Sequence, residues 1–167
     1  MPASPARPLY LDDLKVGDIF VSDTHALDKE QIVEFASRYD PQPFHLDEEA
    51  ARDSFFQGLA ASGWQTAALS MRLMVHSLPV ANGLIGAGTE LSWSQPTRPG
   101  DVLRVTSTIK DIQPSRSKAD RGMVTVESIT TNQHGERLQK LTSKLLVFRK
   151  PASACRKKPH SGCQLWG

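Results

Sequence analysis

The chain has 167 residues, of which 39% are apolar and 23% charged, and its formal net charge is +2. These values are typical of a single soluble globular domain, and the small charge argues against a dedicated nucleic-acid-binding protein, which normally concentrates basic residues on one face. Residues 1–8 lack the apolar core of a signal peptide, and no apolar run approaches the roughly 18 residues of a membrane span, so neither feature is expected.

The first predicted elements are a strand and a helix. Residues 18–26 favour a strand, and Asp28 with Gln31 three residues later has the spacing of a capping box. The apolar residues that follow recur at i, i+3, i+4 and i+7, as on one helix face: Ile32, Phe35, Ala36 and Tyr39.

A loop with two prolines ends this helix. Pro41 and Pro43 fix their own φ angles and disfavour helical backbone in the residues before them, so residues 40–44 are predicted to form a stiff, extended loop. Such a loop can hold the carboxylate of Asp40 and the imidazole of His45 at a fixed separation. The sequence therefore predicts a pair suited to general acid–base chemistry.

Two further helices are predicted. Asp47 can cap a short helix that runs through Arg52, and Ser62 with Gln65 has capping-box spacing at the start of a longer helix that ends before Pro79. The longer helix is apolar on nearly all sides, which is typical of a buried central helix. Its apolar residues are Trp64, Ala67, Ala68, Leu69, Met71, Leu73, Met74, Val75 and Leu78.

Four strands are predicted in the remainder, separated by turn signals: 84–94, 102–112, 123–131 and 138–148. Consecutive strands favour an antiparallel meander, which the first strand can join. We therefore expect an α+β fold in which a five-stranded antiparallel curved sheet wraps around the long helix. Residues 1–149 form one domain in this interpretation, and residues 150–167 form a disordered basic tail.

Both cysteines, Cys155 and Cys163, fall in this tail. The core therefore has no disulfide framework, which favours a reducing, cytoplasmic setting. Together with His160 they offer three zinc-type ligands, but the spacing matches no common finger and a fourth ligand is missing. A tail without metal is the preferred interpretation.

These motifs resemble those of the MaoC-like dehydratases, a hot-dog-fold group that includes (R)-specific enoyl-CoA hydratases. The similarity extends over residues 9–149. Within the family, this sequence resembles the branch with nodulation-protein-N-like members. It rests on the lead-in 14–18, the loop 40–47, the Ser-Gly pair at the start of the long helix, and the turn 99–101. The family loop pattern Asp-x-Asn-Pro-x-His carries the catalytic residues, and its Asp and His match Asp40 and His45.

The resemblance implies hydration of a trans-2-enoyl-CoA thioester, or the reverse dehydration, with no metal or redox cofactor. Asp40 and His45 would share one water, and the backbone N–H of Gly63 would lie in the oxyanion hole. The acyl-CoA would lie along the contact of a homodimer or higher oligomer, with no nucleic-acid or membrane partner. The candidate substrate contacts are Gln42, Ser62, Trp64 and Arg98.

Simpler structural roles remain open for each of these residues. Asp40 can cap a helix end, His45 can be a packed loop histidine, Gly63 can be a permissive helix-start residue, and Trp64 can be part of the core. Arg98 is one of four basic residues that can either meet the phosphates of coenzyme A or lie in solvated loops. The other three are Arg116, Lys118 and Arg121.

Two other functions compete with the hydratase. One is a thioesterase on the same scaffold, which would release free thiol from a saturated acyl-CoA. The other is a non-catalytic module that binds acyl thioesters, which is kept open by the departures from the family pattern at Tyr39, Gln42 and Ala68. Tyr39 stands in place of Gly, Gln42 of Asn, Ser62 of His, and Ala68 of a Ser within the helix.

Overall fold

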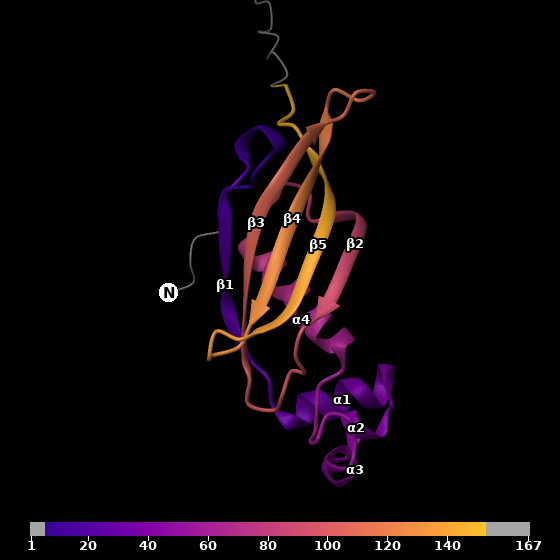
Figure 1. The fold of residues 1–167 in the computed structure, drawn as a ribbon. Helices are drawn as coiled ribbons and strands as arrows, with labels where there is room; N and C mark the ends of the chain where they lie inside the picture. The colour runs from indigo at the N-terminus through magenta and orange to yellow at the C-terminus, as the bar shows by residue number, and fades with distance from the viewer. Residues whose placement is uncertain (1–5, 153–167) are drawn as a thin grey trace, which may run out of the picture.

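The computed structural model describes residues 6–152, and these residues form one layer of sheet with a long helix against it and three short helices at one end (Figure 1). The predicted tail, with Cys155, His160 and Cys163, lies outside the described residues apart from its first three positions. The helices are α1 (Lys29–Tyr39), α2 (Pro43–Leu46), α3 (Glu48–Arg52) and α4 (Gly63–Ser77), after a 3₁₀ turn at Leu11–Asp13. The strands are β1 (Ile19–Ala26), β2 (Ile85–Trp93), β3 (Val102–Pro114), β4 (Arg121–Thr131) and β5 (Arg137–Phe148).

The sheet is antiparallel and has the strand order β1-β3-β4-β5-β2. The prediction of five strands is confirmed, but the prediction of a simple four-strand meander is wrong. Only β3, β4 and β5 follow one another as neighbours, whereas β2 pairs with β5 at the far edge. The connection from β2 to β3 therefore runs from one edge of the sheet toward the other, where β3 lies beside β1, and it passes the start of α4 (Figure 1).

Apolar side chains of α4 and the sheet form the core. Leu73 and Met74 of α4 pack against Leu103 and Val105 of β3 and Leu141 of β5. A second cluster around Val124, Val126 and Val147 fills the end of the sheet away from α1–α3, and alternation of buried and half-buried residues along β4 matches a strand with one buried face. The whole arrangement is the α+β hot-dog fold that the motifs implied.

One face of α4 departs from the prediction of a helix buried all round. Trp64, Met71 and Val75 are exposed in the single chain, whereas Thr66, Ser70 and other residues on the opposite face are buried against the sheet. The sheet therefore covers one side of this helix, and an apolar stripe remains open to a further partner.

The caps explain where the helices begin. Asp28 accepts a hydrogen bond from the Gln31 N–H, and Asp47 accepts one from the Ala50 N–H, as predicted for helix N-caps. Tyr39, which the pattern placed on the apolar face of α1, is 70% exposed at the end of that helix. The last turn of α1 thus projects beyond the core and brings Asp40 to the edge of a cleft.

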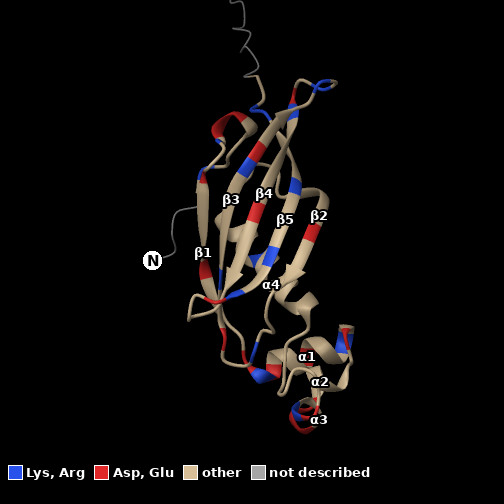
Figure 2. Ribbon diagram, in the orientation of Figure 1, with Lys and Arg blue, Asp and Glu red and all other residues tan. Residues whose placement is uncertain are grey.

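Within the described residues, 6–152, the longest helices are too short and too polar to cross a membrane. Basic and acidic residues are interspersed along the strands rather than separated into faces (Figure 2). This distribution agrees with the small net charge.

Candidate active site

The helix end and the two prolines set the backbone between Asp40 and His45. Asp40 caps the C-terminus of α1 through its N–H, which donates to the Ala36 carbonyl at 2.9 Å. Gln42 has extended backbone, as expected before a proline, but Pro43 opens the short helix α2 instead of continuing an extended loop. Proline is favoured at the first helical position because its φ suits a helix and no N–H is needed there. The prediction of an extended loop is therefore wrong from Pro43 onward.

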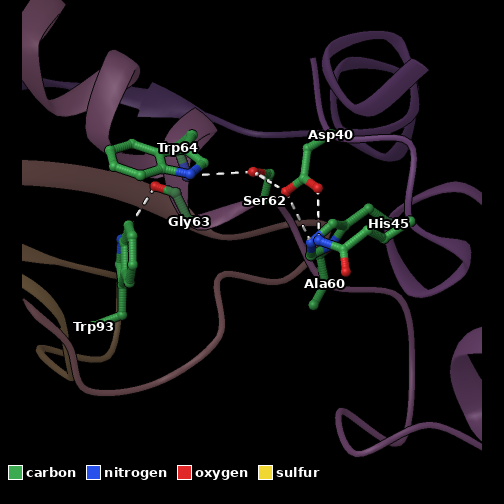
Figure 3. A network of polar contacts seen from close by, with 8 residues as sticks. Asp40, His45, Ala60, Ser62, Gly63, Trp64 and Trp93 are labelled. Atoms are coloured by element: carbon green, nitrogen blue, oxygen red, sulfur yellow. Dashed lines mark hydrogen bonds and ion pairs between the residues drawn. The ribbon is translucent and has the colours of Figure 1, made fainter. Parts of the chain in front are cut away.

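His45 lies on α2 and is only 4% exposed. Its Nδ1 donates to the Ala60 carbonyl at 2.6 Å, because a carbonyl oxygen can only accept. This bond fixes the orientation of the ring and leaves Nε2 facing the carboxylate of Asp40, with 3.3 Å between Nε2 and Oδ2 (Figure 3). In the neutral imidazole, Nε2 is then the atom that can take a proton.

The Asp40 carboxylate is held by three side chains. Oδ2 accepts from the Ser62 hydroxyl at 2.6 Å in addition to facing His45, and Oδ1 accepts from Nε2 of Gln42 at 2.6 Å. Burial raises the pKa of Asp40, but the hydrogen bonds from Ser62 and Gln42, with a smaller effect of His45, together hold that pKa below its ordinary value. The carboxylate is thus ionised at neutral pH.

Ser62 and Gln42, predicted as substrate contacts, both donate hydrogen bonds to Asp40, and their contact with a substrate stays a prediction. Ser62 is fully buried and is also the N-cap of α4, where its Oγ accepts from the Trp64 N–H at 3.2 Å while its hydroxyl donates to Asp40 (Figure 3). The predicted capping box is incomplete, because the Gln65 amide donates to the Gln31 carbonyl of α1. Ser62 therefore connects Asp40 by a hydrogen bond to the start of α4.

Gly63 opens α4 beside this pair. Within residues 6–152 its N–H donates no hydrogen bond, and it lies at the positive end of the helix macrodipole. A Cβ at this position would lie 2.6 Å from the indole of Trp93, whose Nε1 donates to the Gly63 carbonyl at 3.1 Å. Glycine is therefore required by the close approach of an aromatic ring, in addition to any role in catalysis.

Trp93, at the end of β2, was not predicted as a site residue. Its indole meets that of Trp64 edge to face, with 5.4 Å between the ring centroids. Trp64 is 63% exposed, so the alternative that it belongs to the core is wrong. A tryptophan at the end of a predicted strand carries no local signal of a site, because its neighbour Gly63 is thirty positions earlier in the chain.

Most of these groups line one cleft of about 510 Å³ between α2, the start of α4 and the connection from β2 to β3, whereas Ser62 lies outside its lining. Asp40, Gln42, His45, Gly63 and Trp64 line it. The remaining lining residues are Phe44, Phe55, Phe56, Ala61, Thr66, Trp93, Ser94, Gln95, Pro96 and Thr97. An acid–base pair, an unengaged backbone N–H and an apolar wall thus converge on one space.

Arg98, a predicted substrate contact, does not line this cleft. Its guanidinium donates to three backbone carbonyls, those of Phe56, Gly58 and Leu59, at 2.5, 2.9 and 3.3 Å. Arg98 thus secures the loop that follows α3, and its contact with a substrate phosphate stays a prediction. The other basic candidates lie on the connection between β3 and β4 (residues 115–120) and at the start of β4, at the opposite end of the sheet from α1–α3 (Figure 1).

In the part of the chain that the structure describes, no three His, Cys, Asp or Glu residues are grouped as metal ligands. The tail with its two cysteines is outside that part. The cleft presents a carboxylate, an imidazole, side-chain hydroxyls and a backbone N–H, and the absence of a cofactor stays a prediction.

Comparison with known proteins gives matches over most of the chain. The model of the MaoC like domain matches residues 15–132. The crystal structure of a MaoC-like dehydratase from Rhodospirillum rubrum is 59% identical and has a TM-score of 0.85, and the match covers 86% of this chain and 99% of that one. The (R)-hydratase PhaJ1 from Pseudomonas aeruginosa shares the fold at 21% identity, with a TM-score of 0.71 over 93% of this chain and 97% of that one.

Two curated proteins are also similar. The uncharacterized protein YdeM of Bacillus subtilis is 36% identical over 128 residues, which are 75% of this chain and 89% of YdeM. A 3-hydroxybutyryl-CoA dehydratase of Methylorubrum extorquens is 30% identical over 115 residues, 68% of this chain and 71% of that protein. With a family model that spans most of the chain, a hot-dog fold and relatives at this level of identity, the protein belongs to the MaoC-like dehydratase family.

Proposed function

We propose that this protein is a hydro-lyase that adds water to a trans-2-enoyl-CoA thioester, or removes it from the 3-hydroxyacyl-CoA. The observation that carries the proposal is the pairing of Asp40 Oδ2 with His45 Nε2 at 3.3 Å, on the same cleft as the unengaged Gly63 N–H. Membership of the MaoC-like family supports it, as does the similarity to a 3-hydroxybutyryl-CoA dehydratase.

The pair is suited to activating one water. Asp40 is ionised at neutral pH, and the Nδ1–H bond to Ala60 leaves His45 Nε2 as a proton acceptor. A water beside the pair, in contact with both side chains, can lose one proton to the pair as its oxygen bonds to the β-carbon, and the pair returns one proton to the α-carbon. The product then gains both hydrogens and the oxygen of one water. Each such proton transfer typically contributes about 10²–10⁴-fold to the rate.

Addition at the β-carbon places negative charge on the thioester oxygen before the α-carbon is protonated. The Gly63 N–H, at the positive start of the 15-residue helix α4, would donate to that oxygen. One oxyanion donor is commonly worth about 3–4 kcal/mol of transition-state stabilisation. Gly63 is therefore proposed as the oxyanion-hole donor.

The proposal includes a second copy of the chain. Every residue of β2 is exposed or only half-buried, and β2 is one of the two edge strands of the sheet, whose outer backbone groups have no neighbouring strand. The open apolar stripe of α4, formed by Trp64, Met71 and Val75, supports the same conclusion. We propose a homodimer, whose partner would cover these surfaces near the cleft.

The direct test follows the loss of absorbance of the conjugated 2-butenoyl thioester when protein is added. Asp40→Asn and His45→Ala are expected to lower kcat by at least about 10²-fold each, because each removes a proton-transfer group. His134→Ala is the matched control, since His134 lies in the turn between β4 and β5, outside the cleft. Full activity in both site variants would reject the assigned roles.

Two outcomes would point to the alternatives. Release of free thiol from a saturated acyl-CoA would favour a thioesterase. Thermal stabilisation by acyl-CoA with no turnover of either substrate would favour a binding module.

A further inference from the structure

The cleft has a buried floor and an exposed mouth. His45, Ala61, Thr66 and Thr97 are each at most 6% exposed, whereas Phe55 is 94% exposed and the two tryptophans are also open. Because the imidazole of His45 is itself part of the floor, the reacting carbons of a thioester must reach that depth. The acyl chain beyond the β-carbon can then extend only where the floor leaves space.

Two threonines close the floor. Thr66 lies almost one turn after Gly63 on α4, and Thr97 faces it from the connection between β2 and β3. Their Oγ1 atoms are 2.8 Å apart and form a buried hydrogen bond. The path from the proposed oxyanion donor into the protein therefore ends on a joined pair of side chains.

Further polar side chains fill the space behind this pair. Ser70, on the next turn of α4, has its Oγ 2.7 Å from both the Thr66 carbonyl and Thr130 Oγ1. Gln139 donates to Ser70 Oγ at 3.1 Å, and its Oε1 accepts from the Trp93 indole at 3.0 Å. We call this buried set the hydroxyl plug; its members are Thr66, Ser70, Thr97, Thr130 and Gln139.

An alkyl chain cannot enter the hydroxyl plug without cost. It would have to separate hydrogen-bonded groups that are all 3% exposed or less and would leave them unpaired in an apolar contact. Trp93 closes the side next to Gly63, since its ring leaves no room even for a Cβ there. The closed floor and the Trp93 ring therefore limit the length of the acyl group that can be buried beside His45.

We infer that the site is specific for short-chain 2-enoyl thioesters of the 2-butenoyl class, because the hydroxyl plug ends the acyl pocket just beyond the reacting carbons. This inference rests on the proposed function, and it adds Thr66 and Thr97 as the residues that determine chain length. Longer linear acyl groups have no buried path past them.

The test compares kcat/KM for 2-butenoyl-, 2-hexenoyl- and 2-octenoyl-CoA. Pockets that lack room for an extra methylene discriminate by about 10- to 200-fold, so kcat/KM is expected to fall at least about tenfold from 2-butenoyl- to 2-hexenoyl-CoA. Thr66→Ala shortens the plug and is expected to raise the 2-hexenoyl to 2-butenoyl ratio about tenfold. Thr66→Val keeps the volume and should leave the ratio close to that of the wild type.

The control is Ser107→Ala, which removes one half of a buried hydroxyl pair, Ser107 with Ser128 at 2.8 Å, outside the cleft. It should lower stability as Thr66→Ala does, without a change in the ratio. Equal kcat/KM for the 2-butenoyl and 2-octenoyl substrates in the wild type would overturn the inference. So would a ratio that Thr66→Ala leaves unchanged.

Calorimetric titration with butyryl-CoA and octanoyl-CoA separates this inference from the proposed function. Tighter binding of butyryl-CoA than of octanoyl-CoA supports the short pocket even if no thioester is hydrated, in which case only the hydro-lyase proposal fails. Equal or tighter binding of octanoyl-CoA overturns the short pocket, whatever the activity.

Discussion

At the scale of single residues, the site depends on how one carboxylate is held. Asp40 receives hydrogen bonds from Ser62 and Gln42 on its two oxygens and faces His45, which is fixed in turn by the Ala60 carbonyl. No member of this set other than Asp40 and His45 needs to touch the substrate. In the proposed reaction, the positions of Asp40 and His45 decide which oxygen and which nitrogen would contact the water, so residues that position this pair should affect pH dependence as well as rate.

Ser62→Ala tests this arrangement. Loss of the hydroxyl removes the main interaction that lowers the pKa of Asp40, so that pKa should rise. Because the ionised form is lost as pH falls through this pKa, the acid limb of the kcat/KM profile for 2-butenoyl-CoA should move to higher pH. The N-cap of α4 is lost as well, which should lower the unfolding free energy by about 1 kcal/mol.

Ser62→Thr is the matched control, since it keeps a hydroxyl for both Asp40 and the Trp64 N–H. It should retain the wild-type acid limb. An unchanged acid limb in Ser62→Ala, despite the loss of stability, would show that Ser62 acts only as a helix cap.

Gly63→Ala tests the close approach of Trp93. The new methyl group would lie 2.6 Å from the indole, so the ring or the start of α4 must shift. Overpacking of this kind lowers the unfolding free energy by about 1–3 kcal/mol. Movement of the Gly63 N–H should also reduce kcat. Unfolding in urea measures the first effect and the 2-butenoyl assay the second.

Gly86→Ala on β2 is the control for this prediction, because a Cβ there would meet no atom within 4 Å. The double variant Gly63→Ala with Trp93→Leu should recover part of the stability by making room. A Gly63→Ala protein as stable and as active as the wild type would contradict the contact.

At the scale of elements, the loop between α3 and α4 forms one wall of the cleft and depends on a distant strand connection. Phe55 and Phe56 line the cleft, and this loop includes Gln57 with a positive φ of 52°. The guanidinium of Arg98 donates hydrogen bonds to three backbone carbonyls of this loop. A residue predicted to meet phosphates therefore shapes the cleft without lining it.

Arg98→Ala should release this loop. Three carbonyls lose a charged donor, which we expect to lower the unfolding free energy by about 2 kcal/mol. Hydrogen exchange of the amides in residues 54–59 should increase, and KM for 2-butenoyl-CoA should rise more than kcat falls, because the acid–base pair itself is not contacted.

Arg104→Ala, on the exposed face of β3, is the control and should change none of these quantities. Protection of residues 54–59 that stays at the wild-type level in Arg98→Ala would contradict the structural role. A selective loss of CoA affinity with unchanged exchange would instead restore the predicted phosphate contact.

At the scale of the whole molecule, one sheet covers only one side of its helix. The strand β2 is an edge strand whose residues are exposed except for the half-buried Leu91, and the exposed stripe of α4 carries Trp64 and Met71. Apolar surface of this kind beside an unpaired strand edge is typical of an interface between copies of a chain. The cleft is bordered by both elements, so assembly and activity should be linked.

Met71→Glu tests the dimer. A charge placed in the interface would be costly to desolvate, so the variant should elute as a monomer where the wild type elutes at twice the mass. Light scattering after size exclusion measures the change, and activity should fall with it. Ile19→Glu, at another exposed apolar position but on the opposite edge strand β1, is the control and should remain dimeric. A monomeric wild type would contradict the proposal.

Much of the local structure could be predicted from the sequence. Asp28 and Asp47 cap helices as their spacing indicates, the five strands lie within a few residues of the expected ranges, and Asp40 and His45 meet as the motif implied. These features depend on residues close together in the chain, where backbone preferences and hydrophobic periodicity carry the information.

Other features were decided only by the tertiary structure. The contacts of Ser62 with Asp40, of Trp93 with Gly63 and of Arg98 with the loop after α3 join residues 22 to 42 positions apart. The pairing of β2 with β5 rather than β3, and the exposed face of α4, likewise follow from how elements pack. Local patterns determine which elements form and which groups can react. Long-range packing alone determines which side chain meets which, because distant residues are brought together only when the elements bury their shared faces.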